Sequence, residues 1–213
     1  MTTVIHRFLA ALLLLAGLAS PVAAAPAVEP LSPEDKAAVA QAEQYLNGIQ
    51  TLQSKFVQVN PDGRQLGGTF HLARPGRMRL EYEPPLRDFI VADGSFLFYW
   101  DGEMEQQSST PIGSTLADFI LRPQIRLGGD VTVTRVFRTP GAVEITLVES
   151  KDPGKGALTL IFEDRPFQLR QWRVRDAQGL TTEVALLDPR QGVTYPRDFF
   201  YFKEPARRRE QFR

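Results

Sequence analysis

The first periodic stretch of the chain repeats its apolar residues at intervals of three and four, which is typical of one face of an α-helix. Ser32 precedes Pro33, and Asp35 follows three residues after the serine, a combination that starts helices. We therefore predict a helix from Pro33 to about Asn47, ended by Gly48. Its apolar stripe comprises Val39, Ala42, Tyr45, Leu46 and Ile49.

From residue 52 onward the pattern changes to the alternation of β-strands, broken by turn sequences such as Asn-Pro-Asp-Gly at 60–63. A helical run over 115–121, capped by Ser114, separates two sets of strands. No βαβ alternation is present, so we expect a mainly β fold, an antiparallel barrel or sandwich of eleven or twelve strands. The predicted strands are 52–59, 65–73, 77–82, 88–92, 96–100, 103–108, 131–137, 142–149, 157–162, 167–175, 180–187 and 198–202.

One arginine shares a strand face with apolar residues. At a period of two, Phe70, Leu72 and Arg74 lie on one face, opposite the face of His71. A buried guanidinium carries five donors and needs several acceptors, although Arg74 could instead reach the rim of a barrel. The runs 96–100 and 199–202 are apolar on both faces, as expected for either a filled core or a sheet curled around an apolar hollow.

The first residues have the composition of a secretory signal peptide. Arg7 precedes a short apolar run at 8–18, and small residues follow it. That run is shorter than the roughly 20 residues needed to span a bilayer. We predict a leader over 1–24, a mature start near Ala25, and one exported domain over 25–213.

The remaining composition excludes several classes of function. Removing Arg7 from the 25 basic residues leaves 24 against 25 acidic ones, so no basic stripe for nucleic acid is expected. The chain has no cysteine, and hence no disulfide, no cysteine nucleophile and no site for acylation. Beyond the leader no segment approaches transmembrane length, so we expect a soluble product.

Chemistry-bearing motifs are few. After the leader the single histidine is His71, which we interpret as an exposed or half-buried structural residue. No G-x-S-x-G sequence occurs, and Gly154-Lys155-Gly156 lacks the other residues of a phosphate loop. Asp101, Glu103 and Glu105 are better explained by a solvated edge strand than by a calcium site. We therefore expect no enzyme, no metal and no cofactor.

Several motifs nevertheless resemble one family. Gly67-Gly-Thr-Phe-His-Leu-Ala-Arg-Pro75, the strand with Arg-Leu-Glu-Tyr at 79–82 and Ile90-Val-Ala-Asp-Gly-Ser-Phe-Leu-Phe-Tyr99 are similar to the periplasmic outer-membrane lipoprotein carriers, the LolA-like family. Phe-Ile-Leu-Arg at 119–122 is similar too, whereas Tyr99-Trp-Asp-Gly-Glu departs from the family's usual Tyr-Asp-Pro. The resemblance is densest from about 50 to 125.

The resemblance implies an incomplete antiparallel β-barrel of about eleven strands, closed over an apolar cavity by a lid of short α-helices. It also implies that Arg74 holds the lid shut through backbone carbonyls, which we expect at Ile120 and Leu121. The cavity lining that we predict is Phe70, Leu72, Met78, Leu80, Tyr82, Ile90, Phe98, Trp100, Leu46 and Ile49.

By the same resemblance, the expected function is that of a monomeric periplasmic chaperone. It would shield the acyl chains of lipoproteins between an inner-membrane ABC-type exporter and an outer-membrane receptor. The alternatives are a paralogue that carries another lipid, such as a glycolipid or sterol-like lipid, and a periplasmic regulator that senses lipoproteins.

Overall fold

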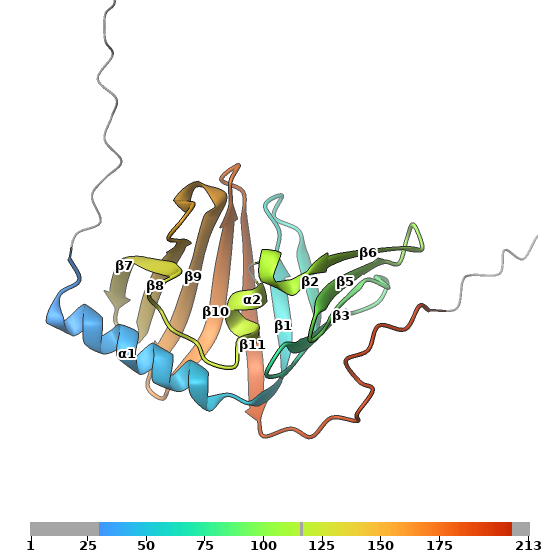
Figure 1. The fold of residues 1–213 in the computed structure, drawn as a ribbon, viewed down its shortest axis with the longest axis horizontal. Helices are drawn as coiled ribbons and strands as arrows, with labels where there is room; N and C mark the ends of the chain where they lie inside the picture. Colours follow the sequence, from blue (N-terminus) through green and yellow to red (C-terminus); the bar gives the residue numbers. More distant parts are fainter. Residues whose placement is uncertain (1–29, 116, 206–213) are drawn as a thin grey trace, which may run out of the picture.

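The structure is a computed structural model that describes residues 30–115 and 117–205; the predicted leader lies outside them. All eleven strands in this part of the chain belong to one antiparallel sheet, in the order β6-β5-β4-β3-β2-β1-β11-β10-β9-β8-β7 (Figure 1). The predicted mainly β, open antiparallel architecture with about eleven strands is therefore confirmed.

The elements follow one another as two strand meanders separated by a helical segment. They are α1 (Pro33–Gly48), β1 (Thr51–Val59), β2 (Gln65–Ala73), β3 (Arg77–Tyr82), β4 (Phe89–Asp93), β5 (Phe96–Asp101), β6 (Gln106–Pro111), the 3-10 helix η1 (Ile112–Ser114), α2 (Ala117–Leu121), β7 (Val131–Thr139), β8 (Ala142–Glu149), the 3-10 helix η2 (Pro153–Lys155), β9 (Gly156–Asp164), β10 (Phe167–Asp176) and β11 (Thr181–Gln191).

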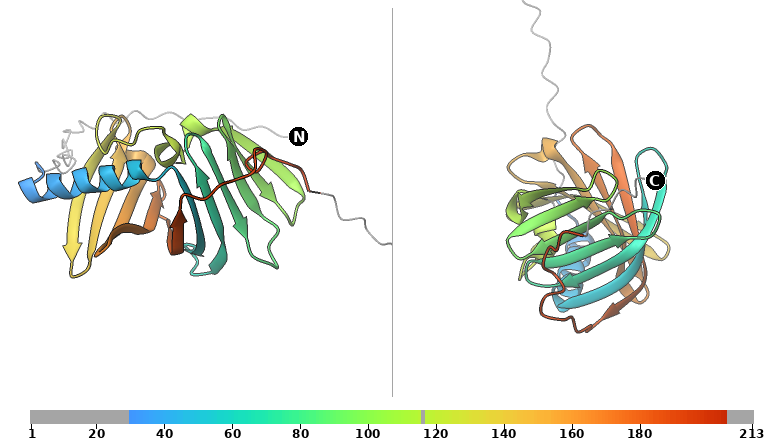
Figure 2. Two further views of the ribbon diagram at one scale, coloured as in Figure 1. Left: turned by 90° about the horizontal axis from the view of Figure 1, so that it is seen from below. Right: turned by 90° about the vertical axis from the view of Figure 1, so that its right-hand side faces the viewer.

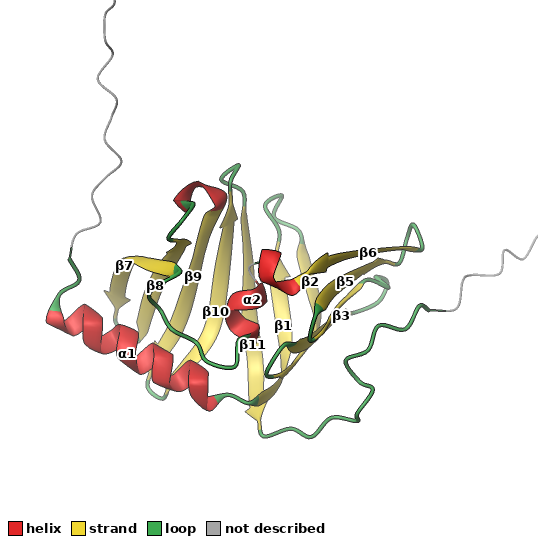
Figure 3. Cartoon of the chain, in the orientation of Figure 1, coloured by secondary structure: helices red, strands yellow, loops and turns green. Residues whose placement is uncertain are grey.

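The two meanders become one sheet because the first strand pairs with the last. β1 pairs with β2 on one side and with β11 on the other, with Phe56 opposite Leu186. The sheet curls, and α1 and α2 lie on its inner side (right-hand view of Figure 2). The helices cover one face of the sheet (Figure 3), so inward side chains from both meanders enter a common core.

Helix α1 forms where the sequence predicts it. The Ser32 side chain accepts a hydrogen bond from the Asp35 amide at 3.1 Å, and Pro33 occupies the first turn. Ala42 and Leu46 are buried on its inner face. At the start of the helix, Arg138 of β7 forms an ion pair with Asp35.

Three predicted elements differ from the observed ones. Residues 103–105 form a turn rather than a strand, because the Asp101 carboxylate accepts the amides of Glu103 and Met104. The predicted helical run 115–121 forms α2 only from Ala117, and Ser114 belongs to the 3-10 helix η1 instead of capping that run. The third difference is the aromatic run 198–202, which forms turns and an irregular segment instead of a strand.

The segment Tyr195–Phe202, here called the C-terminal cover, packs on the outer face of the first meander (left-hand view of Figure 2). Phe202 stacks on Phe89 and Phe98, with ring centroids 5.7 and 5.2 Å apart. Phe199 lies edge-on to His71 at 4.8 Å. The cover therefore gives the outer face of β2–β5 its own apolar cluster, separate from the inner core.

The cover can be tested by a matched pair of substitutions. Phe202→Ala should lower the free energy of unfolding by about 1–2 kcal/mol, since a partly buried aromatic ring becomes a methyl group. Tyr201→Ala should change it little, because the Tyr201 side chain is 52% exposed. Urea unfolding of both variants measures the difference. Equal losses would mean that the Phe202 contacts do not stabilise the fold.

Candidate functional site

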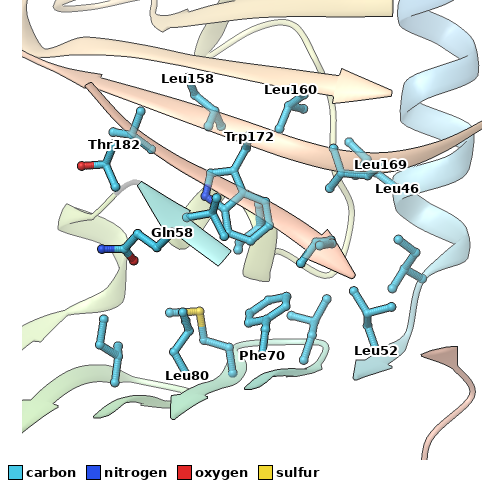
Figure 4. Close-up of a pocket in the computed structure, with 18 of the residues that line it drawn as sticks. Leu46, Leu52, Gln58, Phe70, Leu80, Leu158, Leu160, Leu169, Trp172 and Thr182 are labelled. Carbon is cyan, nitrogen blue, oxygen red and sulfur yellow. The ribbon is translucent and has the colours of Figure 1, made fainter. Parts of the chain in front are cut away.

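A cavity of about 300 Å³ lies between the concave face of the sheet and the helices. Both meanders contribute to it: Phe70 and Leu80 face Leu158, Leu160 and Trp172 across it (Figure 4). The lining is Leu46, Ile49, Leu52, Gln58, Phe70, Leu72, Arg74, Met78, Leu80, Tyr82, Ile90, Ile120, Ile125, Leu158, Leu160, Leu169, Trp172, Val174, Thr182, Val184 and Leu186. The predominance of aliphatic and aromatic groups suits an apolar ligand.

Eight of the ten residues predicted to line the cavity do lie on its wall. They are Phe70, Leu72, Met78, Leu80, Tyr82, Ile90, Leu46 and Ile49. The alternation in β2 and β3 accounts for the first five of them, because Leu72 and Met78 are opposite one another in the register, as are Phe70 and Leu80.

Phe98 and Trp100 lie on the other side of the sheet, and their predicted position in the cavity is wrong. Trp100 is 3% exposed and belongs to the outer cluster with Phe89, while Phe98 stacks on Phe202. The run 96–100 is apolar on both faces, so its alternation could not distinguish the concave face from the covered outer face.

The second meander was missed as a source of lining residues. Leu158 and Leu160 alternate as predicted for a strand, and so do Val184 and Leu186. The alternation in β10 is interrupted, because the register with β9 shifts between Leu169 and Gln171. This irregularity brings Leu169 and Trp172, which differ in parity, to the same wall.

Arg74 points inward, as its parity predicts. It follows the last residue of β2, is 7% exposed and lines the cavity. Its Nη2 donates a hydrogen bond to the carbonyl oxygen of Leu46 near the end of α1, and its backbone amide donates to Gln50 at 2.8 Å. Burial lowers the pKa of the guanidinium, which still remains charged.

The predicted carbonyl acceptors at Ile120 and Leu121 are not those that Arg74 uses. Ile120 lines the cavity, and the Leu121 carbonyl accepts the amide of Gly76 at 2.8 Å. Gly76 has a φ of +76°, a turn geometry that favours glycine. Hence the β2–β3 region holds both helices, but through different groups: the Arg74 side chain holds α1, and the Gly76 amide holds α2.

Two polar side chains of α1 hold the loop that links α2 to β7, and no sequence pattern indicated them. Asn47 donates to the Ile125 carbonyl at 2.9 Å and accepts the Ile125 amide at 2.8 Å. Glu43 accepts the Leu127 amide at 2.6 Å. We call α1, α2 and the loop 122–130 the lid, since these bonds join them over the cavity.

At the end of the cavity farthest from Arg74, the polar side chains of Tyr82 and Gln58 are hydrogen-bonded to each other. The Tyr82 hydroxyl donates to Gln58 Oε1 at 2.9 Å, and Gln58 Nε2 donates to Asn60 at 2.7 Å. Burial raises the pKa of the Tyr82 phenol. Thr182 of β11, which is opposite Val174 of β10, also lies at this end of the cavity (Figure 4).

His71 is buried rather than exposed or half-buried, because the C-terminal cover lies over it. It is 6% exposed, and its Nε2 lies 3.7 Å from the Glu81 carboxylate, beyond hydrogen-bond distance. Together with His71, the Arg79 guanidinium, which donates to Glu81 at 2.8 Å, lowers the pKa of Glu81 from 4.5 to about 2. Of these two contacts, only the one from Arg79 is within hydrogen-bond distance.

The lowered pKa of Glu81 predicts a specific acid dependence. A carboxylate with a depressed pKa stabilises the folded state above its unfolded pKa, and this contribution is lost as the pH falls from about 4.5 to about 2. The Glu81 side chain is 45% exposed, so water reduces the effect. Glu81→Gln should therefore weaken the dependence of Tm on pH across that window. An unchanged profile would show that Glu81 does not contribute to it.

No group of three or more His, Asp or Glu side chains within residues 30–115 and 117–205 is arranged to hold a metal ion. In the same part of the chain, no helix combines the length and apolar character required to cross a membrane.

Comparison with known proteins adds a family match to this geometry. The family model described as "Outer membrane lipoprotein carrier protein LolA" matches residues 47–203, more than half of the chain. An outer-membrane lipoprotein carrier protein of Methylococcus capsulatus is 29% identical over 170 residues, 76% of this chain and 81% of the relative. The protein of the same name from Chromobacterium violaceum is 28% identical over 193 residues, 86% of this chain and 91% of the relative.

Proposed function

Because the chain belongs to the LolA family of outer membrane lipoprotein carrier proteins, we propose that it carries acylated lipoproteins and shields their acyl chains in the cavity. The observation that carries this proposal is the apolar hollow of about 300 Å³ between the sheet and the lid. An acyl chain needs an apolar wall and no catalytic group, and the cavity provides such a wall.

We propose that the lid moves during loading, and the size of the cavity supports this. A volume of about 300 Å³ is at the low end of ligand pockets, which span about 300–1,000 Å³. The closed cavity thus has room for a segment of one slender chain rather than for several chains. We propose that the lid opens to admit the rest, with α1 parting from α2 and the loop 122–130, and that the closed form is the empty form.

Three contacts would hold the lid in its closed position. We propose that Arg74 holds the end of α1 through the Leu46 carbonyl, while Gly76 holds α2 through the Leu121 carbonyl. Asn47 and Ile125 join α1 to the loop between α2 and β7. Release of cargo would restore all three contacts.

The cost of exposing acyl chains to water favours direct transfer between proteins. Burying a methylene group contributes about 0.8 kcal/mol, so one long chain in full contact would contribute roughly 10 kcal/mol. We propose that an inner-membrane ABC-type exporter loads the carrier and that an outer-membrane receptor unloads it. The sequence contains no nucleotide-binding motif, so the exporter would supply the energy.

The place of action follows from the same proposal. A carrier between two membranes works in the periplasm, and the predicted leader over 1–24 would direct the chain there and then be removed. We expect the mature carrier to act as a monomer, without enzymatic activity and without a cofactor.

The experiment that tests the function is recovery of the cargo. The mature protein, purified from the periplasm of a bacterium that expresses it, should contain triacylated lipoprotein detectable by mass spectrometry. Added to membranes that hold labelled lipoprotein, exporter and ATP, it should bring the label into the soluble fraction. Recovery of a glycolipid or sterol-like lipid instead, with no release of lipoprotein, would contradict the proposal.

A further inference from the structure

The Arg74 guanidinium is only partly paired. Its Nη2 donates to the Leu46 carbonyl, but Nε and Nη1 are buried and have no hydrogen-bond partner within the described residues. Buried side-chain nitrogens without a partner are uncommon in folded proteins, and each represents a substantial loss of hydration. The third such atom is Nδ1 of His71, which lies on the outer face of the sheet.

Arg74 lines one end of the apolar cavity, and its Nε and Nη1 are covered by protein atoms in this closed form, so that an acceptor would reach them when the lid opens. The cavity residues nearest to Arg74 in the strand register and along α1 are apolar, among them Leu46, Ile49 and Met78. No ion pair joins Arg74 to a carboxylate in the described part of the chain. In an apolar surrounding, an uncompensated guanidinium attracts an oxygen acceptor strongly.

The far end of the cavity differs, since the polar side chains of Tyr82 and Gln58 there already have hydrogen-bond partners. Tyr82 and Gln58 bond to each other, and Gln58 also bonds to Asn60. The strand positions of Gln58 and Arg74 are separated by about eight residues, because Gln58 pairs with Leu66 in β2. At about 3.3 Å per residue the two ends are on the order of 25 Å apart, enough for a long acyl chain.

We propose that the cavity binds an acyl group in one orientation, with the carbonyl oxygen at its head accepting hydrogen bonds from Nε and Nη1 of Arg74. The hydrocarbon tail then runs along the wall of Leu72, Leu80 and Trp172 toward Gln58. This inference rests on the proposed function and gives it a polar recognition point: Arg74 would bind the lid with one nitrogen and the cargo with the other two.

Two kinds of lipid supply the required chemistry. The ester carbonyl of a lipoprotein's acyl group and the carboxylate of a free fatty acid both present an oxygen acceptor at the head of a long chain. A plain hydrocarbon presents none. Each charge-assisted bond should favour the first two ligands by about 10- to 100-fold over a hydrocarbon of equal length.

Trp172 provides the measurement, because it lines the cavity while Trp100, the other tryptophan, lies on the outer face. The probes are a fatty acid brominated near its midpoint, its methyl ester and the brominated alkane of equal length. Bromine quenches tryptophan fluorescence on contact, so quenching of Trp172 reports occupancy. For each probe, the ratio of the Kd of a variant to that of the wild type cancels differences in water solubility.

In Arg74→Leu, the Kd should rise by about 10- to 100-fold for the acid and the ester and should not rise for the alkane. Arg74→Lys keeps the charge with fewer directed donors and should lie between the wild type and Arg74→Leu. If Arg74→Leu does not fold, Arg74→Lys provides the test in its place. Thr181→Val changes an exposed threonine of the same strand β11 that does not line the cavity, and it should leave all three ratios near one.

The outcomes separate the inference from the function that it refines. If Arg74→Leu loses affinity for both the acid and the ester, the result supports the carbonyl anchor with an ester-linked cargo. If it loses affinity for the acid alone, the result supports the anchor with a free fatty acid as the ligand. Equal ratios for all three probes would overturn the anchor and leave the carrier function intact. Failure of the wild type to bind any probe would overturn both.

Discussion

Met78→Glu is expected to give a folded protein that no longer takes up acylated cargo. Met78 is 5% exposed and lies on the cavity wall, where an acyl chain would contact it. A carboxylate there must lose its hydration when a chain enters, at a cost of several kcal/mol. Loading should therefore fall by on the order of 100-fold or more, measured as labelled lipoprotein released from membranes.

The protein should tolerate this carboxylate because of where Arg74 lies. Leu72 and Met78 are opposite one another, so Met78 and Arg74 are diagonal neighbours on the same face of β2 and β3. A glutamate at position 78 can reach the free nitrogens of Arg74 and form a buried ion pair. The expected loss of stability is about 1–2 kcal/mol, since each charge compensates the other.

Leu80→Glu is the matched control. Leu80 lies on the same strand face, but its partner is Phe70, and Arg74 is not among its diagonal neighbours. An unpaired buried carboxylate should cost about 3–5 kcal/mol. Urea unfolding of both variants makes the comparison. If Met78→Glu were the less stable of the two, or still loaded cargo normally, the assignment of this wall as the acyl-chain site would be wrong.

Asn47→Ala is expected to loosen the lid. It removes the two hydrogen bonds between Asn47 and the backbone of Ile125, worth about 1–3 kcal/mol in total. The opening equilibrium should shift by roughly 5- to 150-fold. Hydrogen exchange at the Ile125 amide should accelerate accordingly. The variant should load cargo readily but deliver it poorly, because release no longer restores a stable closed form.

Gln50→Ala tests whether the effect comes from the lid or from the end of the helix. Gln50 follows α1 closely and donates to the Asn47 carbonyl at 3.2 Å, but it makes no bond to the loop 122–130. Gln50→Ala should match the wild type both in hydrogen exchange at the Ile125 amide and in delivery of cargo. Unchanged exchange at Ile125 in Asn47→Ala would show that other contacts, such as Glu43 with Leu127, hold the loop.

The sequence alone determined those features that depend only on neighbouring residues in the chain. The cap at Ser32 and Pro33 set the start of α1, and the alternation from Phe70 to Tyr82 set the inner faces of β2 and β3. The same alternation turned Arg74 inward. These features depend on residues within a few positions of one another, so they can be read from the chain itself; the identity of the lid came from the family resemblance.

Tertiary structure decided what depends on residues far apart in the chain. Trp100 and His71 are buried on the outer face, and Phe98 is partly buried there, because the C-terminal cover, 95 or more residues later in the chain, packs over them. The register shift in β10 places Leu169 on the same cavity wall as Trp172, against the simple alternation. Arg74 uses the carbonyl of Leu46 because β1, which starts directly after α1, pairs with β2 and so places Arg74 beside the end of the helix. The alternation along a strand determines the face to which a side chain points, but only the tertiary structure determines which groups it contacts there.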